Sequence, residues 1–243
     1  MHTLARKALI LGLIAPFAAL LVAVAGCTGS SSTQSTQVRF INAVPNGGIA
    51  TFSNAGVFEG NEPFFQQSPY RTVVSTASTT FSFFLAANPA QSFTSASTTL
   101  LNATPYSAIA MGRQDVSTTG DARIPQIQVV QDDQTAPLSG DIRLRIFVVA
   151  PDLSNVNVLV NGTKGASAVS YPSLGTAFNF LTANLTLQVL NATTSAAVTT
   201  PIQFTGIVSG HHYTAFVVEP TITPTYTIDL IDDTTNTLLT PAP

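Results

Sequence analysis

The sequence predicts an all-β protein built as two similar sandwiches of short strands, and three observations support this. Apolar and polar residues alternate with period two along several stretches, the pattern of half-buried strands. Proline and glycine, 15 of each, recur at short intervals, as they do between short strands. No window of about 11 or more residues beyond the N-terminal segment has the periodicity of an amphipathic helix. The alternating stretches are residues 81–85, 156–160, 185–189 and 226–230.

Short segments recur in the same order along the chain, which indicates a tandem repeat. Residues 38–46 align with 144–152, and each segment is an apolar strand with an arginine, Arg39 or Arg145, at its second position. The other two pairs are 106–111 with 213–218 and 130–133 with 230–233. The three offsets are 106, 107 and 100 residues, so order and spacing are kept.

The repeat predicts two domains, at residues 37–136 and 139–235, followed by a C-terminal tail at 236–243. The join between the domains is short and contains Pro137 and Gly140. We therefore expect the two domains to be close neighbours.

The N-terminal segment, residues 1–26, has the three parts of a secretory signal. Arg6 and Lys7 form a short positive region, an uncharged apolar run follows, and small residues, including Gly26, end it. The run is about long enough to cross a bilayer, so a retained transmembrane helix is the alternative. Pro16 in the middle of the run, the small residues at its end and the cysteine that follows favour a cleaved signal.

Cys27 is the one cysteine in 243 residues, so it has no partner for an internal disulfide. Residues 21–27, Leu-Val-Ala-Val-Ala-Gly-Cys, resemble the lipobox of bacterial lipoproteins. This resemblance implies a diacylglyceryl group on the sulfur of Cys27 and cleavage between Gly26 and Cys27. Two or more acyl chains anchor a protein stably. Thr28 stands where lipoproteins of the inner membrane often carry aspartate, which favours the outer membrane.

Residues 27–36 are then the lipidated cysteine and a tether rich in serine and threonine. Nine flexible residues have a root-mean-square span of roughly 15–18 Å. We expect the tether to hold the first domain just clear of the lipid headgroups.

The composition excludes some classes of partner. Charged residues make up 9% of the chain, far below the usual quarter, and the net charge is −3. Removal of residues 1–26, which contain Arg6, Lys7 and no acidic residue, makes the charge −5. A mildly acidic chain without a basic cluster argues against nucleic acid as a partner. No cofactor is expected.

The second repeat resembles a known family, the domain of unknown function 4397. Residues 149–162, Val-Ala-Pro-Asp-Leu-Ser-Asn-Val-Asn-Val-Leu-Val-Asn-Gly, carry most of the likeness, and the pair Asp232–Asp233 completes it. The first repeat departs from the pattern, because it has Val-Pro-Asn at 44–46 and no clear Asn-Gly hairpin after Ile49. The resemblance implies tandem immunoglobulin-like β-sandwiches in bacterial envelope or secreted proteins. It implies no catalytic residue, because the family has no assigned activity.

Acidic pairs end the last strand of each predicted domain. These pairs, which could supply oxygen ligands to Ca²⁺, are Asp132–Asp133 and Asp232–Asp233. Two carboxylates supply too few of the six to eight oxygens that Ca²⁺ takes, so capping of a turn is the main expectation. The adjacent His211 and His212 point to opposite faces of a strand, which argues against a shared metal. We expect them at a turn or strand start.

Arg39 and Arg145 stand among apolar neighbours in their strands. One hypothesis is that each pairs with a carboxylate inside its own domain, at Asp132 or Asp133 and at Asp232 or Asp233; the alternative is solvent exposure.

Aromatic residues are concentrated in the first domain. Phe64, Phe65 and Tyr70 could form a binding patch for a glycan or a protein, although core packing is their more usual role. Carboxylates for catalysis could come from Glu59, Glu62 or Glu219, but no motif singles them out.

The sequence therefore predicts a lipid-anchored protein of the cell envelope, not an enzyme, that acts as a structural or interaction module. Its expected partners are the membrane, through the lipid anchor, and an envelope protein or glycan. Binding of carbohydrate or a surface polymer is the second hypothesis, and an enzyme with an unrecognised site is the third.

Overall fold

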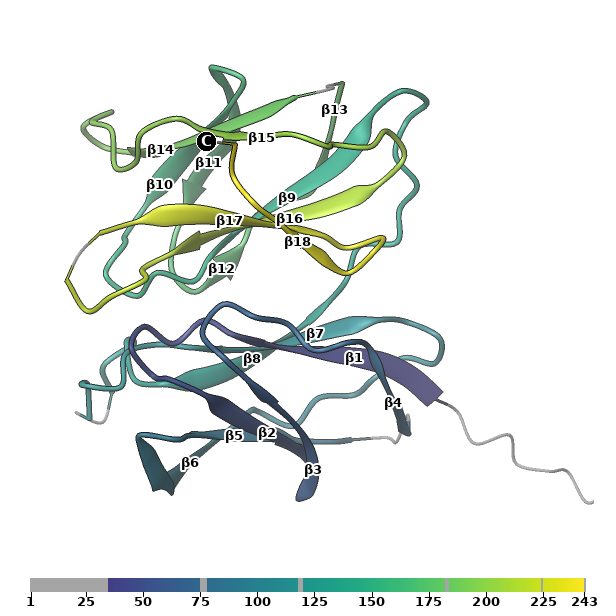
Figure 1. The fold of residues 1–243 in the computed structure, drawn as a ribbon, viewed down its shortest axis with the longest axis vertical. Coiled ribbons are helices and arrows are strands. Elements are labelled where there is room, and N and C mark those ends of the chain that lie inside the picture. The colour runs from purple at the N-terminus through teal and green to yellow at the C-terminus, as the bar shows by residue number, and fades with distance from the viewer. Residues whose placement is uncertain (1–34, 75–77, 118–119, 182–183, 224, 243) are drawn as a thin grey trace, which may run out of the picture. The chain divides into compact units, whose positions relative to one another are not determined.

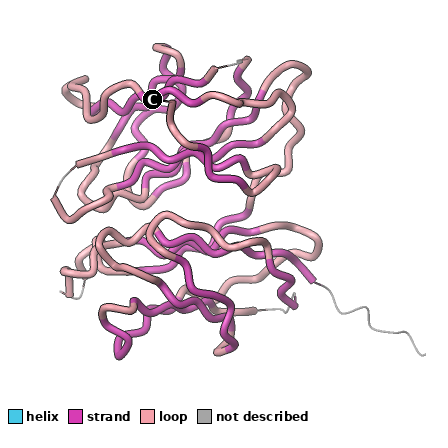
Figure 2. Tube along the Cα trace, in the orientation of Figure 1, coloured by secondary structure: helices cyan, strands magenta, loops and turns pink. Residues whose placement is uncertain are grey.

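The computed structural model describes residues 35–74, 78–117, 120–181, 184–223 and 225–242. The predicted signal peptide, Cys27 and the tether as far as residue 34 lie outside the described residues. The described residues form strands, turns and loops and no helix (Figures 1 and 2), which confirms the all-β prediction. Accordingly, this part of the chain contains no helix of the length and hydrophobicity that a membrane crossing requires.

The N-terminal half forms a first pair of sheets. One sheet has the strand order β4-β1-β7-β8 and the other β3-β2-β5-β6. All neighbours pair antiparallel except β1 and β7, which are parallel. The strands are β1 (Ser35–Asn42), β2 (Ala50–Asn54), β3 (Val57–Glu62), β4 (Arg71–Val74), β5 (Phe81–Leu85), β6 (Asn88–Thr94), β7 (Tyr106–Met111) and β8 (Gln126–Gln131).

The core of the first pair lies between its two sheets. Phe40 of β1 contacts Phe52 of β2, with 5.2 Å between ring centroids, and Phe81 of β5 at 5.9 Å. Phe81, Phe83 and Leu85 are all buried, so the alternation in the sequence correctly predicts the inward face of β5. Edge-on and tilted ring contacts of this kind are favourable beyond their burial.

The C-terminal half forms a second pair of sheets. One has the order β11-β10-β14-β15 and the other β12-β9-β16-β17-β18, with β13 also paired to β9. Here β9 and β16 are the parallel neighbours. The strands are β9 (Ile142–Val148), β10 (Val156–Val160), β11 (Thr163–Val169), β12 (Ser173–Leu174), β13 (Phe178–Phe180), β14 (Leu185–Asn191), β15 (Ile202–Phe204), β16 (His212–Val218), β17 (Thr227–Asp232) and β18 (Thr237–Leu239).

A tight turn joins β10 to β11, as the sequence predicts. Asn161 and Gly162 have φ of 48° and 75°, and Val160 pairs with Thr163 across the turn. Two consecutive positive φ values define the hairpin turn that suits the right-handed twist of the strands.

The first pair of sheets contains a corresponding hairpin that the sequence does not predict. Ala55 and Gly56, with φ of 47° and 83°, join β2 to β3. Residues 46–70 are therefore more regular than their sequence indicates. Alanine rarely adopts a positive φ, so the pair Ala-Gly gives a much weaker turn signal than Asn-Gly.

The predicted C-terminal tail also differs from the structure. β18 lies in it and pairs antiparallel with β17, and Phe204 forms a β-bridge with Pro241. The last residues thus complete the sheets of the second pair.

Four central strands are buried on both faces. Every residue of β7 is buried, as are nearly all of β1, β9 and β16. One face of each strand lines the core of its own pair of sheets. The other faces form a third apolar cluster, the shared layer, in which residues of the two pairs pack together. Its buried members are Ile41, Ala43, Phe65, Ile109, Met111, Phe147, Val149, Phe216, Val218 and Ile231. Burial on both faces explains why these strands read as continuous apolar runs.

Asp229 of β17 is expected to make the free energy of unfolding depend on pH. Burial raises its pKa to about 6, because desolvation penalises the carboxylate. Between the ordinary pKa and this value, the folded state holds a proton that the unfolded state has released, so stability falls as pH rises through this range. We expect Asp229→Asn to raise the free energy of unfolding by about 1–2 kcal/mol at pH 8 and to have little effect near pH 4.

Thermal unfolding of the parent and Asp229→Asn at both pH values checks this prediction. Asp115→Asn is the control, because the hydrogen bond from Arg113 lowers the pKa of Asp115. That control should gain no stability at pH 8. An equal effect of Asp229→Asn at both pH values would contradict the role of the charge.

Candidate functional site

Two buried arginines and two buried aspartates join the two pairs of sheets. Arg39 Nη2 lies 2.5 Å from Asp233 Oδ1. Arg145 Nη2 lies 2.5 Å from Asp132 Oδ1. The four side chains are between 0 and 6% exposed, so their charges are screened little by solvent. We call these four residues the arginine–aspartate network; its two positive and two negative charges balance.

Two hydroxyl groups orient the network. The Nε of Arg39 donates to Ser107 Oγ at 2.8 Å, and this hydroxyl donates to Asp132 at 2.8 Å. In the other half, the Nε of Arg145 donates to Thr214 Oγ1 at 2.6 Å, and Thr214 donates to Asp233 at 2.6 Å. Each aspartate is thus fixed by a hydroxyl of its own half and by an arginine of the other half.

The expectation that each arginine pairs within its own domain is confirmed only for the longer contacts. Arg39 lies 3.6 Å from Asp132, against 2.5 Å from Asp233. Arg145 lies 3.7 Å from Asp233, against 2.5 Å from Asp132. The hydroxyls of Ser107 and Thr214 bridge each arginine to the carboxylate of its own half, and the shorter ion pairs form across the two halves.

The strand register also corrects the alignment of the acidic pairs. Tyr106 pairs with Gln131, whereas Tyr213 pairs with Asp232. Asp132 therefore corresponds to Asp233 and not to Asp232.

Tyr70 contacts two residues of the network, Asp132 and Arg39. Its hydroxyl donates to Asp132 Oδ2 at 2.8 Å, and the guanidinium of Arg39 lies 5.3 Å from the centroid of its ring. Burial, despite the opposing charge of Arg39, raises the pKa of Tyr70 above its usual value. Burial also opposes ionisation of Asp132, but the charges of Arg39 and Arg145 prevail and lower its pKa. Asp132 is therefore a carboxylate at neutral pH.

Phe64 and Phe65, the other members of the predicted aromatic patch, pack against the shared layer. Phe65 is 5% exposed, and its ring centroid lies 5.5 Å from that of Phe216. Phe64 is partly buried and contacts Phe65 edge-on. The three predicted binding residues therefore lie between or beside the two pairs of sheets.

An open cavity of about 470 Å³ adjoins the network. Asp133 and Arg143 on its wall form their own ion pair, with 2.5 Å between Arg143 Nε and Asp133 Oδ2. These two charged side chains of the wall thus neutralise each other. The lining includes Gln131, Asp132, Asp133, Arg143, Arg145 and Leu174.

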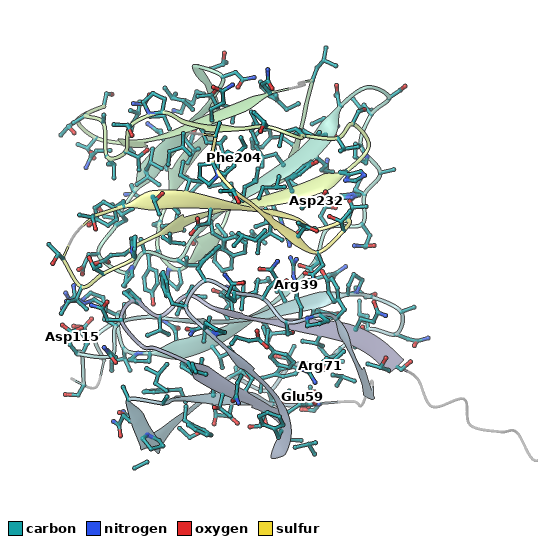
Figure 3. The ribbon with its side chains drawn as sticks, in the orientation of Figure 1. Arg39, Glu59, Arg71, Asp115, Phe204 and Asp232 are labelled. Carbon is teal, nitrogen blue, oxygen red and sulfur yellow. The ribbon has the colours of Figure 1, made fainter. Side chains whose placement is uncertain are left out.

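The predicted calcium ligands are used in protein contacts. Asp132 and Asp233 accept from arginines, and Asp133 from Arg143. Asp232, labelled in Figure 3, accepts from the backbone N–H groups of residues 234 and 235 and lies 2.8 Å from His211 Nδ1. Among the described residues, no group of three or more histidine, cysteine, aspartate or glutamate side chains is placed to hold a metal. Asp232 therefore caps a turn, as expected from the sequence. His212 begins β16, as predicted.

A second charged cluster joins the halves, and no pattern in the sequence indicates it. Asp152, in the Ala-Pro-Asp segment, accepts from Arg113 and from Arg123 Nη1, the latter at 3.1 Å. Glu219 is buried, with Arg113 Nη1 at 3.7 Å, and burial together with the charge of Asp152 raises its pKa. The Ala-Pro-Asp segment is visible in the sequence, but nothing there indicates which arginines contact it.

The remaining candidate acids lie in the first pair of sheets. Glu59 and Glu62 of β3 interact with Arg71, and burial raises the pKa of both carboxyl groups. Figure 3 shows Glu59 close to Arg71 and far from Asp115, which pairs with Arg113 of the second cluster. The structure therefore does not bring Glu59 or Glu62 together with Glu219.

The comparison with protein families gives one match. The family described as "Domain of unknown function (DUF4397)" matches residues 36–158, just over half of the chain. The matched range contains Arg39, Asp132 and Arg145 of the network and ends within β10. No curated protein matches the chain.

Proposed function

Because the chain belongs to the DUF4397 family, which has no assigned activity, we propose its function from its own residues. It is a lipid-anchored protein of the cell envelope that acts as a non-enzymatic structural or interaction module. Thr28, directly after Cys27, favours the outer membrane over the inner membrane. The observation that carries this proposal is the lipobox-like segment 21–27, which ends at the one cysteine of the chain. Two or more acyl chains on that cysteine would provide a stable anchor.

The use of the buried charged side chains in contacts within the protein supports a structural role. Arg39, Asp132, Arg145 and Asp233 are charged, yet each is used in contacts between the two pairs of sheets. Such contacts restrain the two halves relative to each other, as a spacer or rigid presenting module requires. A catalytic site would instead need groups whose polar atoms are free to meet a substrate.

We also propose that the two halves are tandem copies of one immunoglobulin-like β-sandwich domain. In each half, a parallel strand pair, β1–β7 or β9–β16, is followed by one antiparallel neighbour, β8 or β17. The second sheets, β3-β2-β5-β6 and β11-β10-β14-β15, have corresponding orders. Duplication explains why Arg39 and Arg145 occur at matching places.

Fractionation of cells that express the parent chain or Cys27→Ala tests the anchor. We expect the parent in the membrane fraction and the variant either released or left unprocessed, because it lacks the sulfur that carries the lipid. Thr28→Ala is the matched control and should stay with the membrane. Equal membrane association of the parent and Cys27→Ala would contradict the proposal.

A further inference from the structure

The chain enters the first pair of sheets at one end, which is defined by several contacts. Ser35, the first residue of β1, pairs with Val74. Its backbone N–H donates to Asn102 Oδ1 at 3.1 Å, and its carbonyl oxygen accepts from the N–H of Ala103 at 3.1 Å. The loop that precedes β7 therefore lies at the end where the segment from Cys27 arrives. Leu101 belongs to this loop and is 55% exposed.

The β2–β3 hairpin lies at the same end. Asn54, just before its turn, accepts a hydrogen bond from Thr79 Oγ1 at 2.6 Å, and the N–H of Ala55 donates to the carbonyl oxygen of residue 80 at 3.0 Å. Thr79 in turn forms a β-bridge with Thr98, three residues before Leu101. In Figure 1, the starts of β1 and β3 both lie toward the lower right of the first pair.

The tip of this hairpin is apolar and exposed. Val57 and Phe58 directly follow the turn and are 65% and 61% exposed. The turn is tight, so the two side chains are presented on a paired strand and not on a long loop. Single exposed apolar residues are ordinary, but two in succession at a hairpin tip present apolar surface on both faces of the strand.

Charged residues are absent from three described segments beside the hairpin tip. Residues 54–58, 78–80 and 94–104 contain no Asp, Glu, Lys or Arg. The first charged residue after the tip is Glu59, which interacts with Arg71 (Figure 3). An apolar tip within an uncharged polar surface suits the interface of a lipid bilayer, where a neutral surface avoids the cost of moving charge out of water.

The length of chain from Cys27 limits the distance of this end from the membrane. Seven residues, and thus eight Cα-to-Cα steps, separate Cys27 from Ser35, and these steps span at most about 29 Å when fully extended. A flexible segment of that length has a root-mean-square span of roughly 14–17 Å. The end that carries Val57, Phe58 and Leu101 is therefore the end of the described protein held closest to the bilayer.

We propose that the tip of the β2–β3 hairpin, Val57 and Phe58, inserts into the phospholipid interface and gives the protein a second membrane contact beside its lipid. This inference rests on the proposed anchor at Cys27. The second contact would orient the first pair of sheets with its tether end toward the membrane.

Tryptophan fluorescence tests the insertion, because the chain contains no tryptophan. Full-length lipidated Phe58→Trp is reconstituted into phosphatidylcholine vesicles with bromine on the upper part of the acyl chains. The matched control is Ile49→Trp, at the opposite end of β2, where the parent side chain is 44% exposed. We expect a blue-shifted emission and quenching by bromine for Phe58→Trp, and neither effect for Ile49→Trp.

The other outcomes separate the insertion from the anchor. If both variants sediment with the vesicles and neither is quenched, the insertion is wrong and the anchor stands. Equal quenching of both would show contact without the proposed orientation and would also overturn the inference. If the lipid-bearing protein does not sediment with vesicles, the anchor and the insertion both fail.

Discussion

Replacing Asp132 with alanine is expected to lower the free energy of unfolding by about 3–5 kcal/mol. Asp132 is 1% exposed and accepts hydrogen bonds from Arg145, Ser107 and Tyr70. Its removal leaves Arg145 as a buried cation with a single aspartate at 3.7 Å, and leaves two hydroxyl groups without their acceptor. An uncompensated buried charge costs far more than the loss of an exposed ion pair.

Urea unfolding at pH 7 of the parent, Asp132→Ala and Asp115→Ala measures this effect. Asp115 is 43% exposed and pairs with Arg113, so its removal should cost less than about 1 kcal/mol. Because the arginine charges lower the pKa of Asp132, its contribution is present at neutral pH and is lost as pH falls below the ordinary range of aspartate. Similar losses for the two variants would show that the network does not hold the halves together.

Phe216→Ala should destabilise the protein by a similar amount, about 3–5 kcal/mol. Phe216 is 1% exposed and lies at the centre of the shared layer. Its ring centroid is 5.8 Å from that of Phe147 in the same half and 5.5 Å from that of Phe65 in the other half. Truncation removes both contacts and leaves a cavity between two rigid sheets, which have little freedom to close it.

The matched control for this variant is Phe58→Ala, which truncates a phenylalanine that is 61% exposed. It should change the stability of the free protein by no more than about 0.5 kcal/mol. Calorimetry of the two variants checks both values. A small loss for Phe216→Ala would mean that the shared layer contributes little, and that the two pairs of sheets are stable separately.

Local features of the fold are predictable from the sequence because they depend on neighbours in the chain. Alternation identifies the inward faces of β5, β10 and β14, and the pair Asn161–Gly162 identifies its turn. The turn at Ala55 is not predictable, because its conformation is set by the strands on either side and not by a residue that favours it.

Contacts between the two halves are much less predictable. The repeated Arg39 and Arg145 correctly suggest buried ion pairs, but the sequence gives no reason to prefer the aspartate of the other half. That choice depends on how the outer faces of β1 and β9 meet. The place of Phe65 is also not predictable from the sequence. An aromatic residue in a loop looks the same in the sequence whether it lies on a surface patch or in a layer between sheets.

The central claim, anchorage through Cys27, is tested most directly by the intact mass of the protein extracted from membranes with detergent. Anchorage predicts a chain that begins at Cys27 and carries the added mass of a diacylglyceryl group, with or without a further acyl chain on its amine. A mass equal to the full chain of 243 residues, or to a chain that begins elsewhere without lipid, would contradict it.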